Sequence, residues 1–187
     1  MSTTLFLITA MTLTAAHPAA EVVIAGATLA EWRERMSVID PADPQSARWV
    51  PGLIAVVEAE SVPWFTRRQA ALTLGRMRAT ARDAVPVLRR LLDDVGDDPE
   101  TSPQLWALKS LSLFGPVAKD AAPEAVRLLQ SKTTPALSRL TAIDVLSQTG
   151  PAHPIVIPTL IAFAGDASEP TLRRTAIEAL GLNGPAA

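Results

Sequence analysis

The feature that most constrains this chain is a proline-containing pattern that recurs about every 35 residues. A small or β-branched residue precedes each proline, and the four pairs are Val50-Pro51, Val85-Pro86, Ala122-Pro123 and Ile157-Pro158. The prolines lie 35, 37 and 35 residues apart. Apolar or small residues follow each proline at offsets of 2, 5 and 6, which fall on one face of a helix. Proline is tolerated in a first helical turn because the N–H there has no partner within the helix.

A second recurring series lies between these helices. Each unit carries an alanine, an apolar or small residue directly after it and a leucine four residues after it; the alanines are Ala70, Ala107, Ala142 and Ala176. This spacing also fits one helical face, and we expect the alanine where two helices approach closely. Gly-Pro pairs follow the second helix of three units, at 115–116, 150–151 and 184–185. Glycine permits the left-handed residue that ends a helix, and proline prevents its continuation.

These patterns predict an all-α fold, an α-solenoid of about four helical hairpins preceded by an N-terminal cap helix. We expect the cap helix over 28–38 and a loop over 40–46. The hairpin helices are expected near 48–59, 63–77, 81–94, 102–114, 117–130, 134–148, 153–164 and 168–181. Asp166 and Ser168 are candidate caps of the last helix. The sequence shows no alternation of period two that would predict a strand.

The first twenty residues favour an export signal. Residues 1–20 carry no charged side chain, an apolar run spans 5–13, and small residues follow it. The run is too short to cross a bilayer, so no membrane span is expected in the mature chain. The segment before the run lacks Lys and Arg, which leaves a buried first helix or a ragged amino terminus as the alternative. We therefore predict a periplasmic or secreted protein, or a cytoplasmic one if residues 1–20 are not a signal peptide.

The remaining sequence divides into a cap helix and loop over 21–47 and a repeat array over 48–187. The array ends mid-repeat, because 184–187 matches the turn that opens the previous unit and no first helix follows. The last helix carries the apolar Ile177, Leu180 and Leu182. We expect either a fragment of a longer repeat protein or an end covered by a partner or a second copy.

Composition excludes several chemistries. Apolar residues make up 48% and charged residues 19%, which argues against disorder, and the net charge of −2 gives no global attraction to nucleic acid or anionic lipid. Without cysteine there is no disulfide or thiolate ligand, and only His17 and His153 could supply an imidazole. The acidic run 93–100 could bind Ca²⁺ but lacks EF-hand spacing, so we expect a solvated loop. No catalytic, cofactor-binding or metal-binding residue is predicted.

Two segments, 67–75 and 172–181, resemble HEAT repeats, and they are most similar to the short HEAT-like type first named for phycobilisome lyases. The turn at 115–118 fits the same type, and 26–32 resembles the cap that precedes such repeats in exported bacterial HEAT proteins. The resemblance covers about residues 26–187. It implies four HEAT-like helical hairpins in a right-handed stack, with second helices that line a concave protein-binding surface. Some HEAT-like proteins are iron hydroxylases with His-Glu pairs, but this sequence contains no such pair.

The family usually carries an arginine near the start of each second helix. The matching positions here are Arg67, Gln104, Arg139 and Arg173. Gln104 departs from the pattern, and if the arginines are only structural, we expect the loosest joint at its repeat. These arginines either grip carboxylates or phosphates by bidentate hydrogen bonds, or pair with a carboxylate or carbonyl within the stack.

The candidate concave binding surface comprises Arg67, Arg68, Gln104, Trp106, Arg139, Arg173 and Arg174. The aromatic residues near the second helices, Trp64, Phe65 and Trp106, are expected as core or cap residues. The predicted function is a non-catalytic protein–protein interaction or scaffolding module without a cofactor. The alternatives are an accessory repeat module of an enzyme such as a bilin lyase, or a binder of anions or nucleic acid through the arginines. Nucleic acid is disfavoured because few aromatic residues are available for base stacking.

Overall fold

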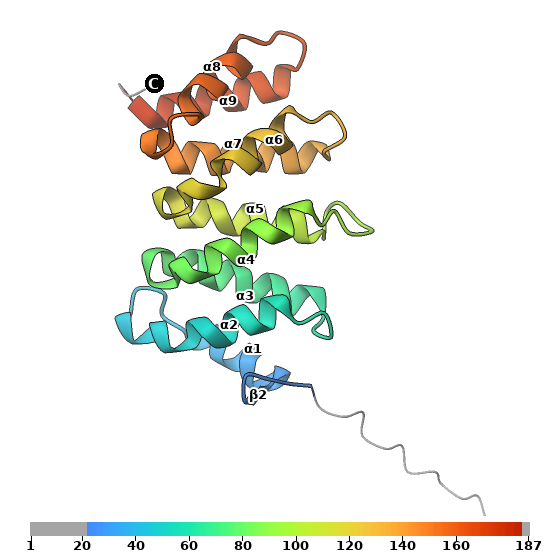
Figure 1. Ribbon diagram of the computed structural model, residues 1–187, viewed down its shortest axis with the longest axis vertical. Helices are drawn as coiled ribbons and strands as arrows, with labels where there is room; N and C mark the ends of the chain where they lie inside the picture. The colour runs from blue at the N-terminus through green and yellow to red at the C-terminus, as the bar shows by residue number, and fades with distance from the viewer. Residues whose placement is uncertain (1–21, 185–187) are drawn as a thin grey trace, which may run out of the picture.

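The structure, a computed structural model, describes residues 22–184. Within this range, four helix pairs stack in chain order along the long axis of the molecule (Figure 1). The pairs are α2 (Val50–Glu58) with α3 (Trp64–Met77), α4 (Val85–Arg90) with α5 (Pro103–Phe114), α6 (Ala122–Gln130) with α7 (Ala136–Thr149), and α8 (Val156–Gly165) with α9 (Pro170–Asn183). The predicted all-α solenoid of about four hairpins is therefore confirmed. The predicted signal peptide over 1–20 lies outside the described residues.

The cap helix α1 (Leu29–Val38) precedes the first pair and starts at a capping box. The Thr28 hydroxyl accepts a hydrogen bond from the Glu31 amide at 3.2 Å, and the Glu31 carboxylate accepts one from the Thr28 amide at 2.7 Å. Trp32 of α1 is buried over Gly52, where any side chain would meet its ring. The cap helix therefore closes the amino-terminal end of the apolar core.

A two-stranded hairpin lies before α1, and the expectation that no strand occurs was wrong here. The strands β1 (Val23–Ile24) and β2 (Ala27–Thr28) pair antiparallel. Ala25 and Gly26 form the turn, with φ of 48° and 77°, as a tight two-residue hairpin turn requires. Two residues per strand are too few to show an alternating pattern in sequence. The indole N–H of Trp32 donates to the Ile24 carbonyl at 2.7 Å and fastens the hairpin to α1.

The first helix of each later pair begins after the predicted residue. Short 3₁₀ turns occupy the preceding residues: η2 (Arg78–Ala84), η4 (Gly115–Ala121) and η5 (Gly150–Ala152). A similar turn, η1 (Pro44–Trp49), precedes α2, and η3 (Leu91–Asp93) follows α4. Ala81 and Ala118 have non-helical backbone angles that interrupt η2 and η4 in the middle. Proline in the first α-helical turn then fixes where each α-helix starts.

The two layers of the stack are held together differently. The second helices α3, α5, α7 and α9 pack on one another in sequence, and the four repeat alanines are fully buried. Direct contact between successive first helices is sparser. Ion pairs also connect each helix pair to the next. The five found in residues 22–184 are Glu58–Arg90, Arg89–Glu124, Asp93–Arg127, Lys132–Glu169 and Arg139–Glu169. The regular spacing of the four repeat alanines therefore correctly predicted that they lie where the second helices pack closely.

Candidate binding surface

The arginines at the start of the second helices tie each second helix to the first helix of its own pair. Their Nε–H groups donate to carbonyls of Val57, Leu129 and Ala164, from Arg67 at 2.8 Å, Arg139 at 2.9 Å and Arg173 at 3.2 Å respectively. Each carbonyl lies in the last turn of a first helix, where backbone acceptors have no partner within the helix. These three side chains therefore act as carboxy-terminal caps of α2, α6 and α8.

Gln104 performs the same task in the second pair. Its side-chain amide donates to the Leu92 carbonyl at 2.8 Å, and it is 2% exposed. The expected loose joint is wrong, because α5 packs along both α3 and α7 more extensively than α7 does along α9. The neighbouring Trp106 is equally buried, and the Arg67 guanidinium lies 5.8 Å from its ring centre. Gln104 and Trp106 thus lie inside the stack and present no side chain to solvent.

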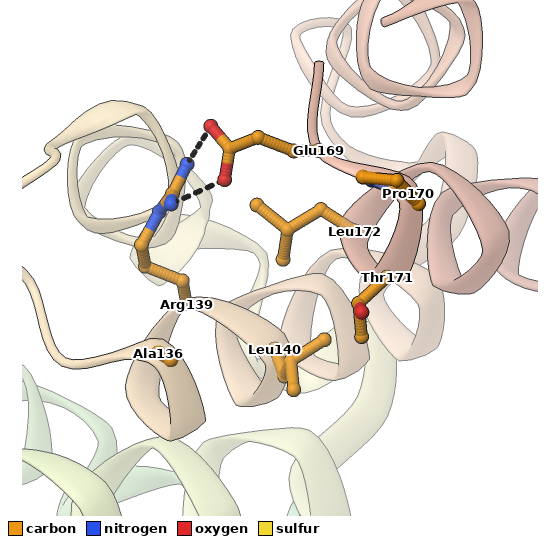
Figure 2. Close-up of a pocket in the computed structure, with 7 residues that line it drawn as sticks. All are labelled: Ala136, Arg139, Leu140, Glu169, Pro170, Thr171 and Leu172. Atoms are coloured by element: carbon orange, nitrogen blue, oxygen red, sulfur yellow. Dashed lines mark hydrogen bonds and ion pairs between the residues drawn. The ribbon is translucent and has the colours of Figure 1, made fainter. Parts of the chain in front are cut away.

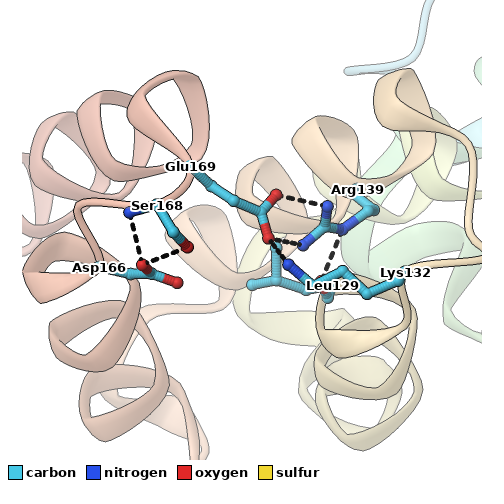
Figure 3. A network of polar contacts seen from close by, with 6 residues as sticks. All are labelled: Leu129, Lys132, Arg139, Asp166, Ser168 and Glu169. Atoms are coloured by element: carbon cyan, nitrogen blue, oxygen red, sulfur yellow. Dashed lines mark hydrogen bonds and ion pairs between the residues drawn. The ribbon is translucent and has the colours of Figure 1, made fainter.

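Arg139 additionally joins the third pair to the fourth (Figure 3). Its two terminal nitrogens donate to the two oxygens of Glu169 at 2.5 and 2.9 Å, and Lys132 donates to the same carboxylate at 2.5 Å. The hydrogen bonds from Arg139, then those from Lys132, lower the pKa of Glu169 to about 2. Glu169 also stands at the amino terminus of α9, where a negative charge is favoured. The carboxylate that binds both terminal nitrogens of Arg139 is therefore a residue of the same chain, Glu169.

Asp166 and Ser168 stabilise the turn before α9 and do not cap the helix, which corrects the prediction. Asp166 accepts hydrogen bonds from the Ser168 amide at 2.8 Å and the Ser168 hydroxyl at 2.6 Å (Figure 3), and these bonds lower the pKa of Asp166. Glu169 is the residue before the helix, and Pro170 opens it without an N–H. The carboxylate of Asp166 therefore finds its donors within the turn.

A pocket of about 230 Å³ opens between the amino-terminal ends of α7 and α9 (Figure 2). Its lining residues are Ala136, Arg139, Leu140, Glu169, Pro170, Thr171 and Leu172. The walls are mainly apolar, and the polar side is the Arg139–Glu169 pair, whose atoms already bind one another. Leu137 of the same helix turn is 42% exposed. The pocket thus offers apolar contact rather than unpaired charge.

Exposed apolar side chains also occur on the second helices α3 and α5. Phe65 is 48% and Leu113 36% exposed, and Trp64 beside Phe65 is also exposed. Trp64 and Phe65 therefore do not lie in the core, whereas Trp106 is buried as expected. Phe65 and Leu137 both stand five residues before the repeat alanine, outside the buried stripe. That shared position is a sequence signal that could have identified them.

The structure separates the seven predicted surface residues into two sets. Arg68, Arg173 and Arg174 are exposed on α3 and α9. The remaining four are half-buried or buried and make contacts within the stack: Arg67, Gln104, Trp106 and Arg139. The seven residues therefore do not form one continuous row of free cations.

Within residues 22–184, no three His, Asp or Glu side chains gather into a group that could hold a metal ion. His153 lies in the turn before α8, where its Nδ1 accepts a hydrogen bond from the Ile155 amide at 3.3 Å. No helix of this described range has both the length and the apolar character needed to cross a membrane.

The stack of successive helix pairs defines an α-solenoid, and Gly-Pro turns end α5 and α7. Residues 66–94 match the PBS lyase HEAT-like repeat family, a range that covers most of α3 and all of α4. Residues 66–94 of this chain are thus similar to a HEAT-like repeat.

Comparisons with other proteins are distant. No curated protein matches the chain. Among solved structures, human deoxyhypusine hydroxylase in complex with glycerol is 14% identical, with 83% of this chain and 84% of that chain covered at a TM-score of 0.35. A similarity at this level transfers no activity to the present chain.

Proposed function

We propose that this chain is a non-catalytic scaffold that binds a partner protein on the exposed side of its second helices. We call this side the second-helix face and define it by Phe65, Leu72, Leu113, Leu137 and Leu140. The observation that carries the proposal is the exposure of apolar side chains on three successive helices, α3, α5 and α7. Apolar groups that remain exposed on a folded surface mark interaction sites, and repeat proteins bind through such extended surfaces.

The polar chemistry of the stack also favours a structural and binding role. The Arg139, Lys132 and Glu169 network is internally paired, and a glutamate with a pKa near 2 remains ionised at neutral pH, where it is a poor general acid or base. Arg67, Arg139 and Arg173 each commit one donor to a carbonyl of the same helix pair. This use of their donors supports the interpretation of the arginines as structural fasteners over that of an anion-binding ladder.

The proposal is tested by affinity capture from a native extract with the full chain. The face variant is Phe65→Glu with Leu137→Glu, and the matched control is Val38→Glu with Val95→Glu, which adds the same charges at exposed apolar positions elsewhere. We expect a protein retained by the wild type and the control but lost by the face variant, with equal helicity by circular dichroism. Retention by all three, loss from both variants, or no retained protein contradicts the proposal.

We further propose that the protein is exported, on the basis of the uncharged apolar segment 1–20. The test is amino-terminal sequencing of the full chain recovered from a bacterial periplasm. Cleavage near residue 16 or 20 supports export, whereas an intact amino terminus in the cytoplasm contradicts it.

A further inference from the structure

The charges of the second helices are segregated along the stack. Helix α3 contains Arg67, Arg68 and Arg76 but no Asp or Glu, and α5 contains Lys109 and no acidic residue. The whole chain has 17 basic and 19 acidic residues, so this uniform sign is local. Acidic residues enter the second helices only at Asp144 of α7 and Glu178 of α9. The charged side chains of the two amino-terminal second helices, α3 and α5, are therefore all basic.

A groove of about 350 Å³ runs along the exposed side of α3. Its lining residues are Phe65, Arg68, Gln69, Leu72 and Arg76. Arg68 and Arg76 are exposed and stand eight residues apart, about 12 Å along the helix axis, with Leu72 midway. No ion pair within residues 22–184 engages either guanidinium. The groove thus has an apolar floor between two available cations.

The helix α1 extends the groove at its amino-terminal end. The Arg33 guanidinium lies 4.9 Å from the ring centre of Phe65, and its Nε–H donates to the Thr66 hydroxyl at 3.2 Å. Trp64 meets the same ring edge-on, with 6.2 Å between ring centres. These contacts hold Phe65 in place while 48% of its side chain remains exposed. A fixed, exposed aromatic ring beside arginines is typical of the residues that dominate binding energy at interfaces.

We propose that this groove, which we call the α3 groove, binds an acidic, amphipathic segment of the partner protein, an inference that rests on the proposed function. Two carboxylates about 12 Å apart pair with Arg68 and Arg76, and an apolar side chain between them packs on Leu72 and Phe65. A single helix with glutamates eight residues apart and a leucine midway has this arrangement, since all three lie on one face.

A protein segment fits this surface better than a nucleic acid does. The cations of the groove are few and are separated by the apolar Leu72 and Phe65, whereas a nucleic acid presents a continuous row of phosphates. Cationic and apolar side chains alternate along the groove, and carboxylates and apolar side chains alternate in the same way along one face of an amphipathic acidic helix.

The test is fluorescence anisotropy with the full chain and a labelled helical peptide that carries two glutamates eight residues apart and a leucine midway. The comparison probes are the same peptide with glutamines in place of the glutamates, and single-stranded DNA and RNA of 20 nucleotides. The groove variant is Arg68→Glu with Arg76→Glu. The matched control, Arg82→Glu with Lys119→Glu, makes the same charge change at exposed sites on the 3₁₀ turns.

We expect the groove variant to weaken binding of the glutamate peptide by about tenfold or more and the control to change it by less than about twofold. No binding of the glutamate peptide, equal binding of the glutamine peptide, or tighter binding of the oligonucleotides overturns the inference. A captured partner that is lost by the Phe65/Leu137 variant but kept by the Arg68/Arg76 variant also overturns it and leaves the scaffold function standing.

Discussion

Arg139 and Arg173 occupy the same position in successive helix pairs but experience different surroundings. Both donate Nε–H to the last turn of a first helix. Arg139 is 8% exposed and is held from its other side by Glu169, whereas Arg173 is exposed. The same residue type at the same position therefore differs in its contribution to stability.

We expect Arg139→Met to lower the free energy of unfolding by about 1–3 kcal/mol, because the Leu129 carbonyl loses its buried donor. The matched change Arg173→Met should cost less than about 0.5 kcal/mol, since water can replace an exposed donor. Urea unfolding followed by circular dichroism measures both. Equal losses of unfolding free energy for Arg139→Met and Arg173→Met would contradict the prediction that the buried arginine contributes more to stability than the exposed one.

The Glu169 network predicts a specific acid sensitivity. Because the folded pKa is lowered from 4.5 to about 2, the ionised form stabilises the fold, fully above about pH 4.5 and progressively less as the pH falls toward 2. We therefore expect the Tm of the wild type to exceed that of Glu169→Gln at pH 7 and the difference to shrink across this window.

Differential scanning calorimetry between pH 2 and pH 7 measures the effect on Tm. The control is Glu60→Gln, which removes one exposed carboxylate outside the network and should keep the wild-type profile. Parallel Tm profiles for wild type and Glu169→Gln would contradict the assigned role of the carboxylate.

At the scale of elements, two glycines at the same position test how closely the second helices pack. A Cβ on Gly75 of α3 would lie 2.7 Å from the Ser110 carbonyl oxygen of α5, whereas a Cβ on Gly181 of α9 would meet nothing within 4 Å. We expect Gly75→Ala to destabilise the protein by about 1–3 kcal/mol through overpacking. Gly181→Ala should stabilise it by about 0.4–1 kcal/mol through helix propensity. Thermal unfolding measures both changes in stability. A stabilising Gly75→Ala would contradict the prediction, because it would mean that α3 and α5 can move apart at this contact without loss of stability.

The order and number of helix pairs could be predicted because each buried stripe repeats in sequence. The alanine of each second helix, fully buried in the structure, follows from the same spacing. The 3₁₀ turns before the first helices could not be predicted, because a proline permits a helix start without excluding a preceding turn of another type. The boundaries of α4 and α6 moved by about four to five residues for this reason.

The binding surface was harder to predict than the fold. Arg67 and Gln104 differ in sequence yet make the same contact, because any side-chain N–H that reaches the carbonyl suffices. The position of Phe65 outside the buried stripe indicates that it is not in the core, but the degree of its exposure also depends on the neighbouring helix, α1, which contacts it through Arg33. Arg67 and Arg139 therefore proved to be internal contacts, whereas less conspicuous apolar residues are exposed on the second helices.

At the scale of the whole molecule, the stack presents different surfaces at its two ends. The amino-terminal end is closed by α1 and the β1–β2 hairpin, with Trp32 buried against the first pair. At the other end, Ile161, Ile177 and Leu182 of α8 and α9 are exposed by 52%, 49% and 76%. Ile143 stands at the position of Ile177 in the preceding pair and is fully buried. Side chains that are covered between pairs are thus exposed on α8 and α9.

We expect this exposed end to bind a hydrophobic dye and to promote self-association of the purified chain, because large apolar patches on a monomer favour association. Ile177→Glu with Leu182→Glu should lower both dye fluorescence and the average mass measured by light scattering at high concentration. The matched control is again Val38→Glu with Val95→Glu, which introduces the same charges at single exposed apolar residues. A wild-type chain that is strictly monomeric with low dye binding contradicts the prediction, as does an equal response of the two double variants. A fall in dye binding confined to the Ile177/Leu182 variant would identify the exposed side chains of α8 and α9 as an apolar association surface of the purified chain.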